Sequence, residues 1–101
     1  MKINTLSDKI VFNILTNIQS GYLEVTNHEG KNFRFGDSNS FLKANIKIKN
    51  PNFTFNLIKG GSVGLAESYM KNEFETDNLS NLIEVTARNI KQIHKFSGLL
   101  D

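Results

Sequence analysis

Residues 41–48, with the sequence FLKANIKI, decide the fold because their side chains alternate in character along the whole stretch. Apolar side chains occupy the even positions: Leu42, Ala44, Ile46 and Ile48. Polar side chains occupy the odd positions between them: Lys43, Asn45 and Lys47. Because successive residues of a β-strand point to opposite faces of its sheet, this pattern predicts a strand with one buried and one exposed face.

A β-hairpin is predicted just upstream, over residues 22–35. Two short runs there alternate apolar and more polar residues, with these apolar positions: Leu23, Val25, Phe33 and Phe35. A polar turn that ends at Gly30 separates the two runs. This combination of period and turn composition is typical of two antiparallel strands.

Four other stretches repeat apolar residues at helical spacing: about residues 6–18, 51–59, 62–70 and 78–96. A polar residue near the start of each is expected to cap it: Ser7 or Asp8, Asn50, Ser62, and Thr76 or Asp77. Gly60-Gly61 is expected to end the second helix, and residues 73–75 to add a brief extended segment. The order of elements predicts an α+β fold, a small antiparallel sheet of about three to five strands packed with about four helices.

The composition fits one globular domain over residues 1–101. Hydrophobic residues make up 39% and charged residues 22%, and the absence of cysteine excludes disulfides and cysteine chemistry. No apolar run approaches the roughly 18 residues of a membrane span. Asp8 and Lys9 interrupt the N-terminal apolar stretch, so no signal peptide is expected and the cytoplasm is the expected compartment.

The motifs of common enzymes do not occur in the chain. His28 lies in the polar hairpin turn, and His94 lies near the end of the last predicted helix, where an imidazolium would favour the helix dipole. The histidines and carboxylates show no spacing that is typical of a metal site. The glycines near Ser62 match neither a nucleophile elbow nor a dinucleotide-binding loop. We therefore expect no catalytic residue, no metal and no cofactor in this chain.

A net charge of +2 gives only weak attraction to anionic partners. The most basic feature is the set of lysines on the outer side of the strand at 41–48: Lys43, Lys47 and Lys49. No aromatic residues are interleaved with these lysines, as binding of single-stranded nucleic acid would favour. We read the set as a solvated face and expect no nucleic-acid partner.

The stretch GGSVGLAESYMKNEFETDN, residues 60–78, holds the strongest functional candidates. In the predicted helix over 62–70, Glu67 is the i+4 neighbour of Val63, and Tyr69 is the i+4 neighbour of Leu65. Two interpretations of Glu67 stay open. It is either a hydrogen-bonded structural carboxylate or a polar group at the mouth of an apolar pocket.

Short motifs run along most of the chain. The hairpin contributes Gly21, Leu23, Val25, Gly30, Phe33, Phe35 and Gly36, and the strand with its exit contributes Ala44, Ile46, Ile48, Asn50, Pro51 and Phe53. The downstream block contributes Gly61, Gly64, Glu67, Tyr69, Met70, Asp77 and Leu79. Together they resemble the N-terminal domain of the cyclopropane-fatty-acyl-phospholipid synthase family. Lys71-Asn72 stands where that family commonly has Asp-Gly, and Phe74 stands where tryptophan is usual.

The resemblance implies a sterol-carrier-like fold that encloses an apolar tunnel. In that family a separate methyltransferase domain transfers a methyl carbon from S-adenosylmethionine to a cis double bond of a phospholipid acyl chain. The present sequence has no D-x-G-x-G-x-G cofactor loop, so the catalytic domain is expected to be missing and S-adenosylmethionine to bind elsewhere. The implied partners are a phospholipid or the inner membrane surface, a catalytic methyltransferase domain, and a second copy in a homodimer.

The resemblance also indicates which residues contact lipid or a neighbouring domain: Glu67, Tyr69, Met70, Gly64, Leu65, Phe53 and Phe74. Further apolar walls are expected from Phe55, Leu57 and Ile58, and a cationic mouth from Lys59 or Lys71. Two alternatives stay open beside this accessory lipid-binding role. One is a dimerisation or docking module that uses an apolar face of the last helix: Val85, Ile90, Ile93 and Phe96. The other is a free-standing soluble lipid carrier.

Overall fold

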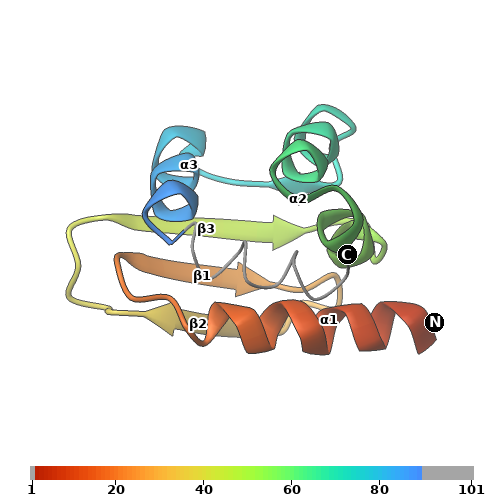
Figure 1. Ribbon diagram of the computed structural model, residues 1–101, viewed down its shortest axis with the longest axis horizontal. Helices are drawn as coiled ribbons and strands as arrows, with labels where there is room; N and C mark the ends of the chain where they lie inside the picture. The colour runs from red at the N-terminus through yellow and green to blue at the C-terminus, as the bar shows by residue number, and fades with distance from the viewer. Residues whose placement is uncertain (1, 90–101) are drawn as a thin grey trace.

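The computed structural model describes residues 2–89, and the side chains of all of these except residues 2–5 and 62. The fold is α+β, as predicted, and Figure 1 shows its arrangement. In chain order the elements are α1 (Lys2–Leu15), β1 (Tyr22–Thr26), β2 (Asn32–Gly36), β3 (Lys43–Ile48), α2 (Phe53–Met70), β4 (Phe74–Glu75) and α3 (Leu79–Arg88).

The four strands form one sheet in the order β2-β1-β3-β4. The predicted hairpin is confirmed, because β1 and β2 pair antiparallel. However, β3 pairs with β1 in parallel, so the expectation of a wholly antiparallel sheet is wrong. The loop over 37–42 carries the chain past the start of β1 to its other edge, where the Tyr22 amide donates to the Leu42 carbonyl at 3.0 Å.

The alternation predicted for residues 41–48 is confirmed in β3. Its apolar side chains Ala44, Ile46 and Ile48 are buried, whereas Lys43 and Lys47 are exposed on the other face. The helices pack on the apolar face, α3 against β3 and β1, and α1 against the edge strand β2. In this second contact the ring centroids of Phe12 and Phe33 lie 4.6 Å apart. The sheet therefore has one face for the core and one for solvent.

The glycine pair at 60–61 ends one helical segment and a second segment follows it, as predicted. Residues 53–70 share the label α2, but Gly61, with φ 57° and ψ −133°, is not helical, so α2 consists of two helical segments that meet at a kink. An L side chain rarely adopts that conformation, which explains a glycine there. The two halves of α2 then pack so closely that a Cβ on Gly64 would lie 2.5 Å from the Asn56 carbonyl oxygen.

The predicted helix starts differ from the observed ones. α1 begins at Lys2, so Ser7 and Asp8 lie inside it, and α2 is preceded by Asn52, whereas Asn50 closes the turn before it. α3 is capped by Asn78, whose side chain accepts from the Asn81 amide at 3.0 Å, and not by Thr76 or Asp77. The Ser62 side chain and the part of the last predicted helix beyond residue 89 lie outside the described residues.

Asn89, immediately after α3, joins the end of that helix to the loop before β1. It is only 2% exposed, and its side-chain oxygen accepts from the backbone amides of Gln19 at 2.8 Å and Ser20 at 3.2 Å. Its side-chain nitrogen donates to the Ser20 carbonyl at 2.8 Å. These bonds hold α3 against the entry to the sheet and so help to fix one side of the site.

Candidate ligand-binding site

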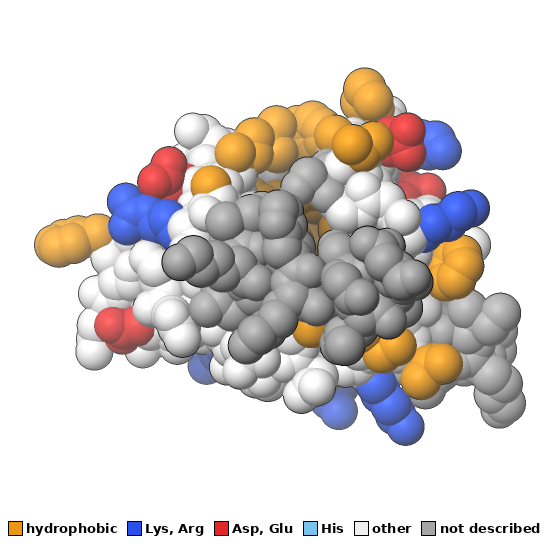
Figure 2. Space-filling view, in the orientation of Figure 1, with side chains coloured by type: hydrophobic (Ala, Val, Ile, Leu, Met, Phe, Trp, Pro, Cys, Tyr) orange, Lys and Arg blue, Asp and Glu red, His pale blue; other side chains and the backbone are white. Residues whose placement is uncertain are grey.

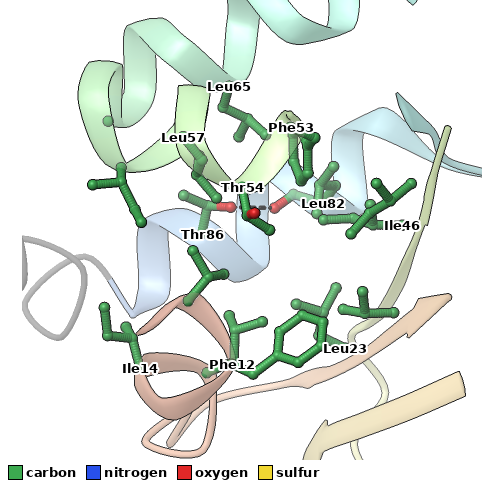
Figure 3. A pocket seen from close by; sticks show the side chains of 16 residues that line it. Phe12, Ile14, Leu23, Ile46, Phe53, Thr54, Leu57, Leu65, Leu82 and Thr86 are labelled. Carbon is green, nitrogen blue, oxygen red and sulfur yellow. Dashed lines mark hydrogen bonds between the residues drawn. The ribbon is translucent and has the colours of Figure 1, made fainter. Parts of the chain in front are cut away.

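An apolar cavity of about 100 Å³ lies between the helices and the buried face of the sheet. Its described lining comes from α1, β1, β3, α2 and α3: Val11, Phe12, Ile14, Leu15, Leu23, Val25, Ile46, Ile48, Phe53, Thr54, Leu57, Ile58, Gly61, Leu65, Leu82 and Thr86. Figure 3 shows Leu57 of α2 and Phe12 of α1 on opposite sides of it. The cavity is thus the space that the helices leave above the sheet.

Only two of the described lining residues are polar, and both hydroxyl protons are engaged. The Thr54 hydroxyl donates to Asp8 Oδ1 at 2.7 Å, and the Thr86 hydroxyl donates to the Leu82 carbonyl at 2.9 Å. No charged side chain lines the cavity among the described residues. Because burial of an unpaired polar group is costly, these walls favour an apolar ligand.

The volume limits what the cavity holds as it stands. An engineered apolar cavity of about 150 Å³ accommodates benzene, whereas pockets for whole drug-sized ligands measure about 300–1,000 Å³. A cavity of about 100 Å³ therefore accommodates a short piece of an aliphatic chain. A complete acyl chain requires the walls to move.

A second hollow, which we call the groove, lies on the other side of α2 and has a volume of about 300 Å³. It is lined by Asn56, Lys59, Gly60, Gly64, Glu67, Ser68, Lys71 and Glu73. The close packing at Gly64 brings the two halves of α2 together and forms its floor. The groove is polar where the cavity is apolar, and the described residues that line the two have no member in common.

The seven residues implied by the resemblance do not form one site. Phe53 and Leu65 line the cavity, and Gly64 and Glu67 line the groove. The other three line a shallow hollow beside β4: Tyr69, Met70 and Phe74. The ring of Phe74 lies between the cavity and this shallow hollow, with its centroid 5.0 Å from that of Phe53 and 5.7 Å from that of Tyr69.

Glu67 and Tyr69 both lie away from the cavity. Tyr69 is 44% exposed, and the Glu67 carboxylate is exposed and makes no hydrogen bond or ion pair with the described residues. Lys59 and Lys71, expected at the mouth of an apolar pocket, line the groove with Glu67. Of the further apolar walls, Leu57 and Ile58 line the cavity, whereas Phe55 is not among its lining residues and is 40% exposed.

Several lining residues were not among the candidates from the sequence. The apolar side of α1 supplies Val11, Phe12, Ile14 and Leu15, and α3 supplies Leu82 and Thr86. The helical period of residues 6–18 and 78–96 did indicate an inward face for both helices. Periodicity gives no signal for a gap left between packed faces, so it did not assign these residues to a ligand site.

Other kinds of site are not found in the part of the chain that the structure describes. No group of three or more His, Cys, Asp or Glu side chains there is arranged to hold a metal ion. None of the described helices is long and apolar enough to cross a bilayer. His28 is exposed in the hairpin turn as predicted, and His94 lies outside the described residues.

The chain was compared with protein families, curated proteins and solved structures. A protein-family model described as a domain of unknown function (DUF7884) matches residues 10–96. No curated protein and no solved structure matches. The match covers nearly all of the described elements, from α1 to α3. The chain therefore belongs to the DUF7884 family.

Proposed function

We propose that this chain is a non-catalytic lipid-binding domain that holds part of an aliphatic chain in the apolar cavity. It presents the lipid to an S-adenosylmethionine-dependent methyltransferase domain of the cyclopropane-fatty-acyl-phospholipid synthase type. The observation that carries the proposal is the cavity itself, whose described lining is apolar apart from two engaged hydroxyl groups. Its natural ligand is a group that water solvates poorly.

The energetics favour such a ligand. Each methylene group that leaves water for an apolar environment contributes about 0.8 kcal/mol. Filling the cavity also restores dispersion contacts that its lining side chains now lack. A short stretch of acyl chain in the cavity therefore gains several favourable contacts, while the remainder of the lipid stays in a membrane or a partner domain.

The bend of α2 offers a way to admit a longer stretch. Gly61 lies in the cavity lining and is where α2 departs from helical geometry. A Cβ at Gly60 or Gly61 would meet no atom within 4 Å, so the space around the bend is open. In this proposal the second half of α2, which carries Leu65, moves outward about Gly61 as the chain enters.

The sequence resemblance supports the link to a methyltransferase. In the proposal the chemistry and the S-adenosylmethionine belong to a partner domain. The lipid comes from the cytoplasmic membrane surface, where the chain acts as a peripheral component. The chain itself supplies binding and positioning.

Titration of the isotope-labelled chain with a fatty acid and with a short-chain phospholipid tests the proposal by NMR. Amide shifts are expected around Leu57, Leu65 and Leu82, which line the cavity. Leu65→Trp, which fills the cavity, should abolish them, whereas Ala66→Trp on the exposed side of the same helix should not. Circular dichroism checks that both variants fold. Equal binding by both folded variants would contradict a cavity site.

A second candidate function, docking of a protein domain, is favoured by an apolar stripe on the outer side of α2. Val63 is 65% and Met70 76% exposed, beside the half-exposed Tyr69. Figure 2 shows hydrophobic side chains along the upper edge, where Figure 1 places α2 and the segment leading to α3. Exposed apolar patches mark interaction surfaces when they are large.

The docking face predicted from the last helix is not supported in its described part. Val85 is buried in the core, and Ile90, Ile93 and Phe96 lie outside the described residues. Sedimentation of the chain and of the Val63→Ser/Met70→Ser double variant distinguishes this candidate. Self-association that the double variant loses would favour docking through α2, and a monomer at all concentrations would count against a homodimer.

A further inference from the structure

The groove collects charges of both signs that are not paired with one another. Lys59 and Lys71 contribute two ammonium groups, and Glu67 and Glu73 contribute two carboxylates. The ion pairs among the described residues all lie elsewhere: Arg34 with Glu24, Lys49 with Glu75, and Arg88 with Glu84. Four charged side chains thus surround one hollow without neutralising each other in direct ion pairs.

The floor of the groove is formed where the two segments of α2 approach each other, and it carries no bulky side chain. Gly64 lies so close to the Asn56 carbonyl that a Cβ would not fit between them, and Ser68 nearby is buried. Glu73 is held at one end, because its Oε1 accepts from Asn56 Nδ2 at 3.1 Å and its amide donates to the Ser68 carbonyl at 2.9 Å. A ligand in the groove therefore meets at least one carboxylate that hydrogen bonds hold in place.

We propose that the groove binds a small zwitterionic group, a phosphate ester joined through a short linker to a primary ammonium. Lys59 and Lys71 bind the phosphate, which offers several acceptor oxygens to two separate ammonium groups. Glu67 and the oriented Glu73 accept hydrogen bonds from the ammonium of the ligand. The phosphoethanolamine group has this chemistry, either as the head group of a lipid or as a soluble molecule.

The balance of charge excludes simpler ligands of one sign. A lone anion in the groove would be attracted by two lysines and repelled by two glutamates, and a lone cation would meet the reverse. Only a ligand with both charges gains from all four side chains. Gly60 in the lining leaves room for it to approach the helix backbone, because a Cβ there would meet no atom within 4 Å.

This inference stands apart from the aliphatic site in the cavity. The described lining residues of the two sites do not overlap, and they lie on different sides of α2. Leu65→Trp should therefore leave the groove able to bind, and substitutions in the groove should leave the cavity able to bind. Failure of one proposal is distinguishable from failure of the other.

The test is an NMR titration of the full chain with O-phosphoethanolamine, and separately with inorganic phosphate, ethanolamine and phosphocholine. O-phosphoethanolamine should bind about tenfold more tightly than either half-ligand, with amide shifts at Gly60, Gly64 and Lys71. Phosphocholine should bind more weakly, because its quaternary ammonium has no N–H donor. If phosphate alone binds as tightly as O-phosphoethanolamine, or if nothing binds, the proposal is overturned.

Variants assign the two ends of the ligand. Lys59→Gln and Lys71→Gln should each weaken O-phosphoethanolamine binding about tenfold, and Glu67→Gln should weaken it without weakening phosphate binding. The matched controls are Lys47→Gln and Glu29→Gln, which change exposed residues outside the groove and should have no effect. If folded Glu67→Gln and folded Lys59→Gln both bind O-phosphoethanolamine as tightly as the parent chain, these residues do not bind the two ends of the ligand.

Vesicles distinguish the two sources of the ligand. Phosphatidylethanolamine vesicles that compete with free O-phosphoethanolamine for the same amides would identify a lipid head group. Vesicles that do not compete would identify a soluble ligand with the same chemistry. Both results support a zwitterion site. The absence of amide shifts in the groove in every titration would contradict it.

Discussion

The two sides of α2 differ as sharply as any two regions of this molecule. The side toward the sheet carries Phe53, Leu57 and Leu65, and it encloses a space almost without polar groups. The other side carries Asn56, Lys59 and Glu67, and it opens to solvent. The same element therefore provides hydrophobic stability on one side and charged side chains without direct ion pairs on the other. Substitutions on the two sides should have very different consequences for stability.

The largest loss is expected for Phe53→Ala on the cavity side. Phe53 is 2% exposed and contacts Phe74, so its truncation should lower the free energy of unfolding by about 3–5 kcal/mol. Phe55→Ala, two residues along the same helix and 40% exposed, is the control and should cost far less. Urea denaturation measures both. Similar losses at the two positions would mean that Phe53 is not a core residue.

A pair of glycine substitutions should change stability in opposite directions. Gly64→Ala places a Cβ 2.5 Å from the Asn56 carbonyl oxygen, so the halves of α2 must separate, and we expect a loss of about 1–3 kcal/mol. Gly60→Ala meets no atom within 4 Å and should raise stability by up to about 1 kcal/mol through helix propensity. Thermal unfolding measures the stability of both variants. A gain in stability for Gly64→Ala as well as for Gly60→Ala would contradict the expected clash with the Asn56 carbonyl.

Removal of the Thr54 hydroxyl makes the cavity still more apolar at a moderate cost. Thr54→Val loses the 2.7 Å hydrogen bond to Asp8, and we expect the free energy of unfolding to fall by about 1–3 kcal/mol. In the binding experiment the same variant should hold an aliphatic ligand at least as tightly as the parent. Weaker binding of the ligand by a folded Thr54→Val variant would show that the hydroxyl takes part in recognition.

The smallest change in stability is expected on the groove side. Glu67→Gln and Lys59→Gln alter exposed side chains, so each should change the free energy of unfolding by no more than about 0.5 kcal/mol. Their effect should appear only in the affinity for a zwitterionic ligand. A loss of more than 1 kcal/mol, measured by urea denaturation, would instead assign Glu67 a structural role.

The course of the strands and helices followed from local patterns. The alternation at 41–48 predicted which face of β3 is buried, because the period of two is a property of the extended backbone. It did not predict that β3 pairs with β1 in parallel, because alternation is the same for either partner and either direction. The crossing made by the loop over 37–42 decided that pairing.

The candidate site also shows the difference between what local sequence pattern predicts and what the fold decides. The block Gly64 to Met70 is contiguous in sequence, but successive residues of an α-helix point about 100° apart. Leu65 therefore reaches the cavity, Glu67 the groove and Met70 the outer surface. A motif that reads as one site along the chain becomes three environments once it is helical.

The sequence by itself determined the α+β class, the position of the elements and the inward face of each strand. These depend on backbone periodicity and on side chains within a few residues of one another. Only the tertiary structure decided the parallel pairing, the close packing of the two segments of α2, and the separation of cavity from groove. Those features depend on the packing of segments distant in sequence, such as Thr54 on Asp8 and Asn89 on Ser20, which local pattern does not encode.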